Sequence, residues 1–177
     1  ELLQVAVDSV TINIADFVTI SGRFAFQRTD DELVLVADQV DASLSLGDYR
    51  VGVENATLVM ILPTAGGVAL EASGGFVFEG PDFANVSVDS VAVQYNTTGT
   101  DFSAAPRTIS IGTISTDVTV ADGTVAAPYI AISAVGLEVD IAGLVRVGGD
   151  FAFSKGTTTA GTSIIRVGVA NFHASLG

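Results

Sequence analysis

Val-Thr-Ile-Ser-Gly-Arg-Phe-Ala-Phe, at Val18–Phe26, decides the organisation of the chain, because it returns as Val-Arg-Val-Gly-Gly-Asp-Phe-Ala-Phe at Val145–Phe153. Over Ile14–Phe26, seven of thirteen residues are identical to those found 127 positions later. The register continues upstream without a gap. Downstream it resumes, after five extra residues in the second copy, with Ala42–Leu44 facing Ala174–Leu176. A match that holds over this length indicates a duplicated unit.

The spacing of the two copies divides the chain into residues 1–127, one full repeat unit, and residues 128–177, the beginning of a second. A period of this length is the size of a whole domain and exceeds the roughly 20–50 residues of a solenoid repeat. We expect the second piece to pack continuously with the first. We also expect it to complete the sheet of the first copy as a neighbour of Val5, Val7 and Ile12. The alternative is that it is covered by the next chain or repeat.

The composition favours a folded, acidic protein. Of the 177 residues, 49% are hydrophobic, and 20 acids outnumber 7 bases to give a net charge of −13. This excess of acids argues against nucleic acids and anionic membrane surfaces as partners. The chain has no Cys, so disulfides and thiol chemistry are excluded. Its longest uncharged runs are broken by Pro63 and Pro128, and we expect no membrane insertion.

The pattern of apolar residues predicts strands along almost the whole chain, with turns at intervals of roughly ten residues. Within Val18–Phe26 the apolar residues alternate with polar ones, which places one face of the strand in a core. We therefore expect burial of Phe24 and Phe26 and of their equivalents Phe151 and Phe153. The predicted fold class is all-β, either an antiparallel β-sandwich or an elongated β-stack built from tandem repeats.

Interruptions in the alternation set the expected strand boundaries. A change of phase within Phe83–Tyr95 predicts a bulge near Ser90. The other expected strands are Leu2–Val7, Val10–Ile20 leading on to Phe26, Glu32–Ala37, Val40–Leu46, Tyr49–Val53, Ala56–Leu62, Val68–Ala72, Phe76–Phe78, and a hairpin of Thr108–Ile114 with Val118–Val120.

Motifs of enzyme active sites are absent from the sequence. The chain has one His, His173, and lacks the Gly-x-Ser-x-Gly, phosphate-loop and dinucleotide fingerprints. A single His on a strand is typical of a surface or edge position. We therefore predict that the protein is not an enzyme and has no catalytic or cofactor-binding residues.

Calcium is the one metal for which the sequence offers candidate ligands. Acids gather near one another in the sequence at Asp30, Asp31, Asp38 and Asp41, and Ca²⁺ prefers six to eight such oxygen ligands. The sequence contains neither an EF-hand loop nor the Gly-Gly-x-Gly-x-Asp β-roll repeat. The alternative is that these acids are solvated and serve solubility.

Three Asn residues lie in Asn-x-Ser/Thr sequences, which are acceptors for N-glycosylation in secreted proteins. They are Asn55, Asn85 and Asn96. Their number is consistent with an extracellular, glycosylated surface.

Two stretches are informative about the family: the Gly-x-Phe-x-Phe strand preceded by Ile-Ala, and Val-Gln-Tyr-Asn-Thr-Thr-Gly at Val93–Gly99. They resemble the long tandem modules of giant secreted bacterial repeat proteins of the adhesin-like or RTX-like kind. The resemblance implies an extracellular structural role in a fibre, stalk or matrix. It transfers no site residues, because the β-roll motif is missing.

We therefore predict a structural repeat unit of an extracellular bacterial fibre, stalk or adhesin, whose partners are further copies of the same repeat. The first alternative is a self-assembling filament or surface-layer subunit, in which separate chains supply the next repeat. The second is a carrier or binding module whose apolar strand faces line a groove for lipid.

Overall fold

The computed structural model describes residues 2–14, 18–80, 84–158 and 161–177, and within these ranges it is all-β, with no helix. The all-β, antiparallel class is confirmed. A helix long and apolar enough to cross a membrane is not found in the described ranges. The strands are β1 (Leu3–Ile14), β2 (Val18–Arg28), β3 (Glu32–Leu46), β4 (Tyr49–Pro63), β5 (Ala69–Glu79), β6 (Ala84–Thr98), β7 (Arg107–Ile111), β8 (Ile114–Val118), β9 (Thr124–Ile141), β10 (Val145–Thr157) and β11 (Ser163–Leu176).

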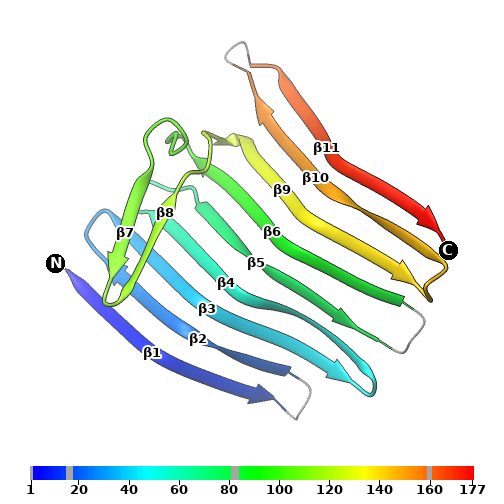
Figure 1. Ribbon diagram of the computed structural model, residues 1–177. Coiled ribbons are helices and arrows are strands. Elements are labelled where there is room, and N and C mark those ends of the chain that lie inside the picture. Colours follow the sequence, from blue (N-terminus) through cyan, green and yellow to red (C-terminus); the bar gives the residue numbers. More distant parts are fainter. Residues whose placement is uncertain (1, 15–17, 81–83, 159–160) are drawn as a thin grey trace.

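Nine of these strands form one antiparallel sheet in the order β1-β2-β3-β4-β5-β6-β9-β10-β11. Each strand pairs with the next one along the chain, except that the β7–β8 hairpin is inserted between β6 and β9 (Figure 1). β1 and β11 are therefore opposite edges. The expectation that residues 128–177 lie beside Val5, Val7 and Ile12 is wrong, because β9 continues the sheet from β6.

Several strands are longer than the sequence pattern predicted, because interruptions in the pattern are bulges instead of turns. β3 runs through Gln39 and β4 through Asn55, each with φ of 49°. The expected Val10–Ile20 strand is also wrong, since β1 ends at Ile14; positions 15–17, like Phe83, lie outside the described residues. The predicted bulge near Ser90 is confirmed by a register shift between β5 and β6.

These bulges lie at mid-strand in every neighbouring pair of the large sheet except β6–β9. A bulge bends its strand and increases the local twist. Because the bulges of neighbouring strands lie side by side, the strands bend at the same level, near mid-length (Figure 1). We call this line across the sheet the crease.

The two sequence copies pair with their neighbours in the same register. Between β1 and β2 the register shifts after Val7↔Phe24, and between β9 and β10 it shifts at Ala134↔Phe151, 127 positions later in both strands. The shift between β2 and β3 likewise matches the one between β10 and β11. Gly22 and its equivalent Gly149 have φ of 154° and 149°, a region that favours glycine.

The core lies between the hairpin and one face of β2–β5. It contains Ala25, Val34, Val36, Val59, Ile61 and Ala69 from the sheet and Phe102, Ile109, Ile111, Ile114, Val118 and Val120 from the hairpin and its flanking loops. The hairpin turns at Gly112 and Thr113, earlier than predicted, and lies across β1–β4 (Figure 1). In β3, Val34 and Val36 lie on the hairpin side and are buried, whereas Leu33 is on the other side and is exposed.

The burial predicted for the phenylalanines is wrong. Ala25, on the opposite side of β2 from Phe24 and Phe26, is the buried residue, at 2% exposure, whereas Phe26 is 39% exposed. The physical reason is that the hairpin covers the face with the smaller side chains. Phe24, Phe26, Phe151 and Phe153 do lie on equivalent strands, but on the uncovered face.

Polar contacts fix the hairpin on the sheet. The Arg107 guanidinium forms a bidentate ion pair with Glu32 at the start of β3. The backbone N–H of Thr119 donates to the Glu71 carboxylate at 2.7 Å, and the Thr113 hydroxyl donates to Asp8 at 2.9 Å. These contacts hold the two ends of the hairpin over β1, β3 and β5.

Truncation of Ile111 tests whether the hairpin interface is the core. Ile111 is 1% exposed, so Ile111→Ala should lower the free energy of unfolding by roughly 2–5 kcal/mol in urea titrations. Val167→Ala is the control on the uncovered face, where the side chain is 74% exposed, and should cost less than about 0.5 kcal/mol. Equal losses for the two variants would contradict this placement of the core.

The Glu32–Arg107 pair predicts a pH dependence of stability. The hydrogen bond from Arg107 lowers the pKa of Glu32, so the pair stabilises the fold at neutral pH and this contribution is lost as the pH falls through the lowered pKa. Glu32→Gln should lower the free energy of unfolding at pH 7 by about 1 kcal/mol. The loss is small because Arg107 is partly exposed and solvent screens the ion pair. The difference from the parent chain should vanish in acid, as chemical denaturation at several pH values can show. A difference independent of pH would exclude this role of the pair.

Candidate functional site: an open apolar face

The face of the sheet opposite the hairpin is apolar from one edge to the other. The pairing register places one residue of each strand in a row across this face. One row consists of Val7, Phe24, Ala37, Leu58, Ala72, Val93, Ile132, Phe153 and Val167. The neighbouring row consists of Val5, Phe26, Leu35, Met60, Leu70, Tyr95, Ile130, Lys155 and Ile165. We call this surface the apolar face.

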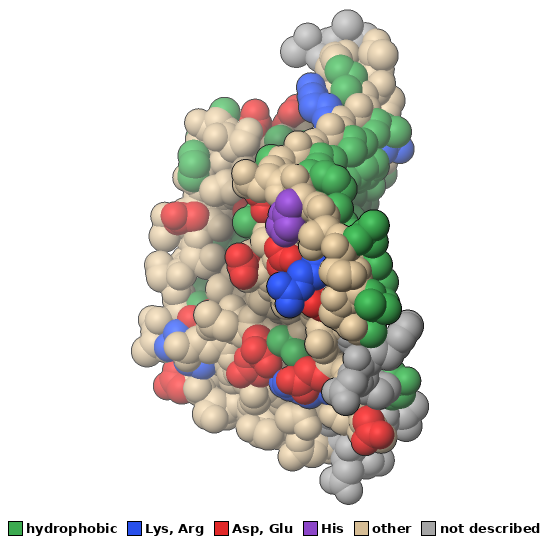
Figure 2. Space-filling model, turned by 45° about the vertical axis from the view of Figure 1, so that its right-hand side comes forward, with side chains coloured by type: hydrophobic (Ala, Val, Ile, Leu, Met, Phe, Trp, Pro, Cys, Tyr) green, Lys and Arg blue, Asp and Glu red, His purple; other side chains and the backbone are tan. Residues whose placement is uncertain are grey.

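No layer of described residues covers the apolar face. Phe153 is 39% exposed and Val167 74%. With the β11 edge turned forward, Figure 2 shows hydrophobic side chains gathered along one side of the molecule, away from the side that carries His173. Soluble monomers rarely expose a contiguous apolar surface of more than a few hundred Å², and larger ones mark binding sites. This face is therefore the candidate functional site.

The crease forms a depression in the apolar face. It has a volume of about 320 Å³ and spans β2 to β6. Phe24, Leu35, Val40, Leu58 and Val93 are among the side chains that line it. Its walls are aliphatic and aromatic, so it suits the burial of hydrocarbon.

Two cations lie on the apolar face, at equivalent positions of the two sequence copies. Arg28 pairs in register with Leu3 and Leu33, and Lys155, 127 positions later, pairs with Ile130 and Ile165. Neither cation forms an ion pair with another described residue. The sequence shows this match at the 127-residue spacing, but no functional motif singles out the two cations.

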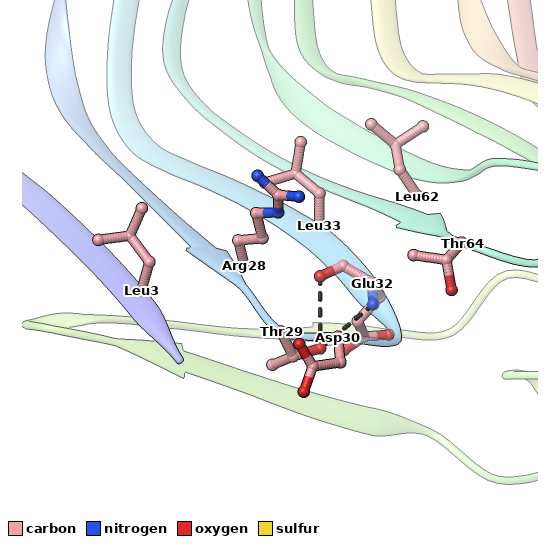
Figure 3. A pocket seen from close by; sticks show the side chains of 8 residues that line it. All are labelled: Leu3, Arg28, Thr29, Asp30, Glu32, Leu33, Leu62 and Thr64. Atoms are coloured by element: carbon pink, nitrogen blue, oxygen red, sulfur yellow. Dashed lines mark hydrogen bonds between the residues drawn. The ribbon is translucent and has the colours of Figure 1, made fainter. Parts of the chain in front are cut away.

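Arg28 stands at the rim of the face, near the ends of β1–β4. A second depression, of about 360 Å³, is lined there by Leu3, Leu33 and Leu62 together with Arg28 and the acids Asp30 and Glu32. Figure 3 shows the guanidinium beside Leu33, on the side away from the Asp30 carboxylate. The cation is thus presented next to aliphatic side chains.

Acidic side chains of the described strands lie on the other face, which we call the polar face, or near strand ends. The ion pairs of the polar face are Arg23–Asp38, Arg50–Glu54, Arg50–Glu79, Arg107–Glu32, Arg146–Asp140 and His173–Glu138. Hydrogen bonding from Arg146 lowers the pKa of Asp140. The charges of this acidic chain are therefore largely separated from its apolar surface.

The structure does not gather the four candidate calcium ligands into one site. Asp30 and Asp31 lie at the β2–β3 turn, whereas Asp38 is about 20 Å further along β3. Asp38 accepts from the Arg23 side chain at 2.8 Å, and Asp41 accepts from the Asn55 backbone N–H at 2.9 Å. Within the described ranges, no cluster of three or more His, Asp or Glu side chains is arranged to hold a metal ion.

The three Asn-x-Ser/Thr sites differ in accessibility. Asn55 and Asn85 are exposed, on β4 and β6. Asn96 is fully buried, and its amide donates to the carbonyls of Thr100 at 2.7 Å and Ala121 at 2.8 Å. Glycosylation of Asn96 is therefore incompatible with this fold, because a glycan would need both the space and one of those donors.

His173 lies on the edge strand β11, as a lone His on a strand predicted. Its Nε2 is 2.7 Å from the Glu138 carboxylate, and its Nδ1 is 3.0 Å from the Asn171 carbonyl. The carbonyl of Asn171 and the charge of Glu138 raise the pKa of His173 above its ordinary value. The side chain is exposed and stands apart from the apolar face.

Comparisons with protein-family models, with the curated proteins and with the solved structures give no match. The function is therefore inferred from the geometry of the molecule.

The titration of His173 tests whether its ring is paired with Glu138 on the polar face. Because the chain has one His, its ring signals can be followed by NMR without ambiguity. We expect a pKa above the ordinary value of a His, and Glu138→Gln should lower it, since the carboxylate favours the imidazolium. Glu54→Gln, on a distant strand, is the control and should leave the titration unchanged. An unshifted pKa in the parent chain would contradict the pair.

Proposed function

We propose that the chain is a structural repeat unit of an extracellular bacterial fibre, stalk or adhesin, in which one sheet continues from unit to unit. The observation that carries this proposal is the equivalence of the two sheet edges to interior junctions of the same sheet. The resemblance to secreted repeat modules and the exposure of Asn55 and Asn85 support the extracellular location.

Each edge strand of the sheet has an equivalent strand inside the sheet. β11 is the equivalent of β3 in the second copy, and β3 pairs on its far side with β4. β1 is the equivalent of β9, and β9 pairs on its far side with β6. A further unit that follows the same register would therefore add its β4 equivalent to β11, and a preceding unit would add its β6 equivalent to β1.

The backbone of β11 is already shaped for such an addition. Asn171 has φ of 52°, as Gln39 has 49° at the equivalent position of β3. A following unit would also bring a hairpin over the polar face of β9–β11. In the described part of the chain no hairpin covers that surface, whereas the β7–β8 hairpin covers the equivalent surface of β1–β3 (Figure 1).

A self-assembling filament or surface-layer subunit is the alternative, in which separate chains supply the neighbouring strands. Long edge strands readily pair with other chains, and no described strand covers the outer edge of β1 or β11. Sedimentation of the chain over a range of concentrations separates the two cases. A monomer at all concentrations favours repeats within one chain, and growth into larger species favours assembly.

Extension of the chain by its own repeat tests the proposal. Residues 46–177 are added after Gly177, which is the equivalent of Ser45. Cys residues replace Ala174 and the added copy of Val53, because Ala42, the equivalent of Ala174, is paired with Val53. A short bis-maleimide should link these two Cys residues, and small-angle scattering should show one elongated body.

The matched control pairs Ala174→Cys with Cys at the added copy of Val59. Val59 pairs with Val36, six residues from Ala42, so a continuous sheet places these two Cys residues about 20 Å apart along the strands. Equal linkage in the test and the control, or two separately tumbling bodies, would show that the sheet does not continue.

A further inference from the structure

We infer that the apolar face is a binding site for a long-chain fatty acid. The carboxylate lies at Arg28 or Lys155, and the hydrocarbon chain runs from there over the apolar face toward the crease. This activity goes beyond the structural role proposed above. The inference rests on three features: an uncovered apolar surface, the crease depression in it between β2 and β6, and a cation in each sequence copy, Arg28 and Lys155, that forms no ion pair with another described residue.

The two cations are the feature that identifies the ligand's polar end. Acids outnumber bases 20 to 7 in the chain, yet the charged side chains that the described strands place on the apolar face are Arg28 and Lys155. Both recur at the same position of the repeat, flanked by large aliphatic side chains. A guanidinium pairs with a carboxylate through two hydrogen bonds, and an ammonium attracts it as a point charge.

The distances on the face suit a single hydrocarbon chain. Phe24, which lines the crease depression, is four residues from Arg28 on the same strand and the same face. Strand geometry makes this about 13 Å. One acyl chain spans half of a bilayer's hydrocarbon core of about 30 Å, or about 15 Å. A carboxylate at Arg28 therefore allows the chain to reach the depression between Phe24 and Leu58.

Charge argues against a second copy of the protein as the occupant. Two apolar faces in contact would bury Arg28 and Lys155. Of the described residues, the acids nearest to Arg28 are Asp30 and Glu32, which line the same depression, and Glu32 is already paired with Arg107. An unpaired buried cation is strongly unfavourable. The net charge of −13 on each copy would add repulsion. A monoanionic amphiphile satisfies both the cation and the apolar surface.

The test is a titration of the full 177-residue chain with a fluorescent C16 fatty acid below its critical micelle concentration, at low and at moderate salt. The Arg28→Gln/Lys155→Gln double variant should bind about tenfold more weakly, as expected when one charged contact is lost. Leu58→Glu, in the crease depression, should abolish binding. The fatty alcohol of equal length should bind the parent chain as weakly as the fatty acid binds the double variant.

Two control variants make the result specific. Arg166→Gln removes an exposed cation of the polar face, and Ser87→Glu adds an acid there; both should bind within about twofold of the parent chain. Urea midpoints show that every variant is folded. Unchanged affinity of the double variant, or an equal loss in Arg166→Gln, would overturn the inference. So would binding to phosphatidylglycerol vesicles without binding of the monomeric fatty acid, because the face would then lie on a membrane surface.

Discussion

The packing of the β7–β8 hairpin on one face of the large sheet is the interaction on which the rest of the structure depends. A single sheet must bury one of its faces against another layer to be stable. Here that layer is two short strands and their flanking loops, and they cover the β2–β5 part of the sheet. The Glu32–Arg107 pair and the Glu71–Thr119 contact fix the position of this layer. The other face is left without a second layer in the described part of the chain.

This unequal cover gives the molecule its two chemically different faces. Small and polar side chains, and the ion pairs that use Arg23, Arg50 and Arg146, lie on the hairpin side. Phe24, Phe26 and their equivalents form the other side. A large exposed apolar face has a free-energy cost in water, so its presence across nine strands points to a ligand or a partner. The cations at Arg28 and Lys155 favour an anionic amphiphile.

The structural role and the binding role are compatible. If the sheet continues from unit to unit, the crease and the cation at the rim recur in each unit, and the apolar face becomes a continuous trough across the strands. A stalk built in this way would carry one fatty-acid site in each repeat. The two roles remain separable by experiment, because strand pairing at β11 and ligand binding at Arg28 depend on different residues.

The sequence by itself determined the all-β class, the period that relates Phe24 to Phe151, the bulge near Ser90 and the edge position of His173. These features follow from local alternation and from identity at a fixed spacing, which do not depend on distant contacts. Only the tertiary structure decided which face is the core. The pattern at Phe24–Phe26 shows that one face is apolar, but burial depends on where a hairpin eighty residues away is placed. Because that hairpin packs on Ala25, the phenylalanines are left at the surface.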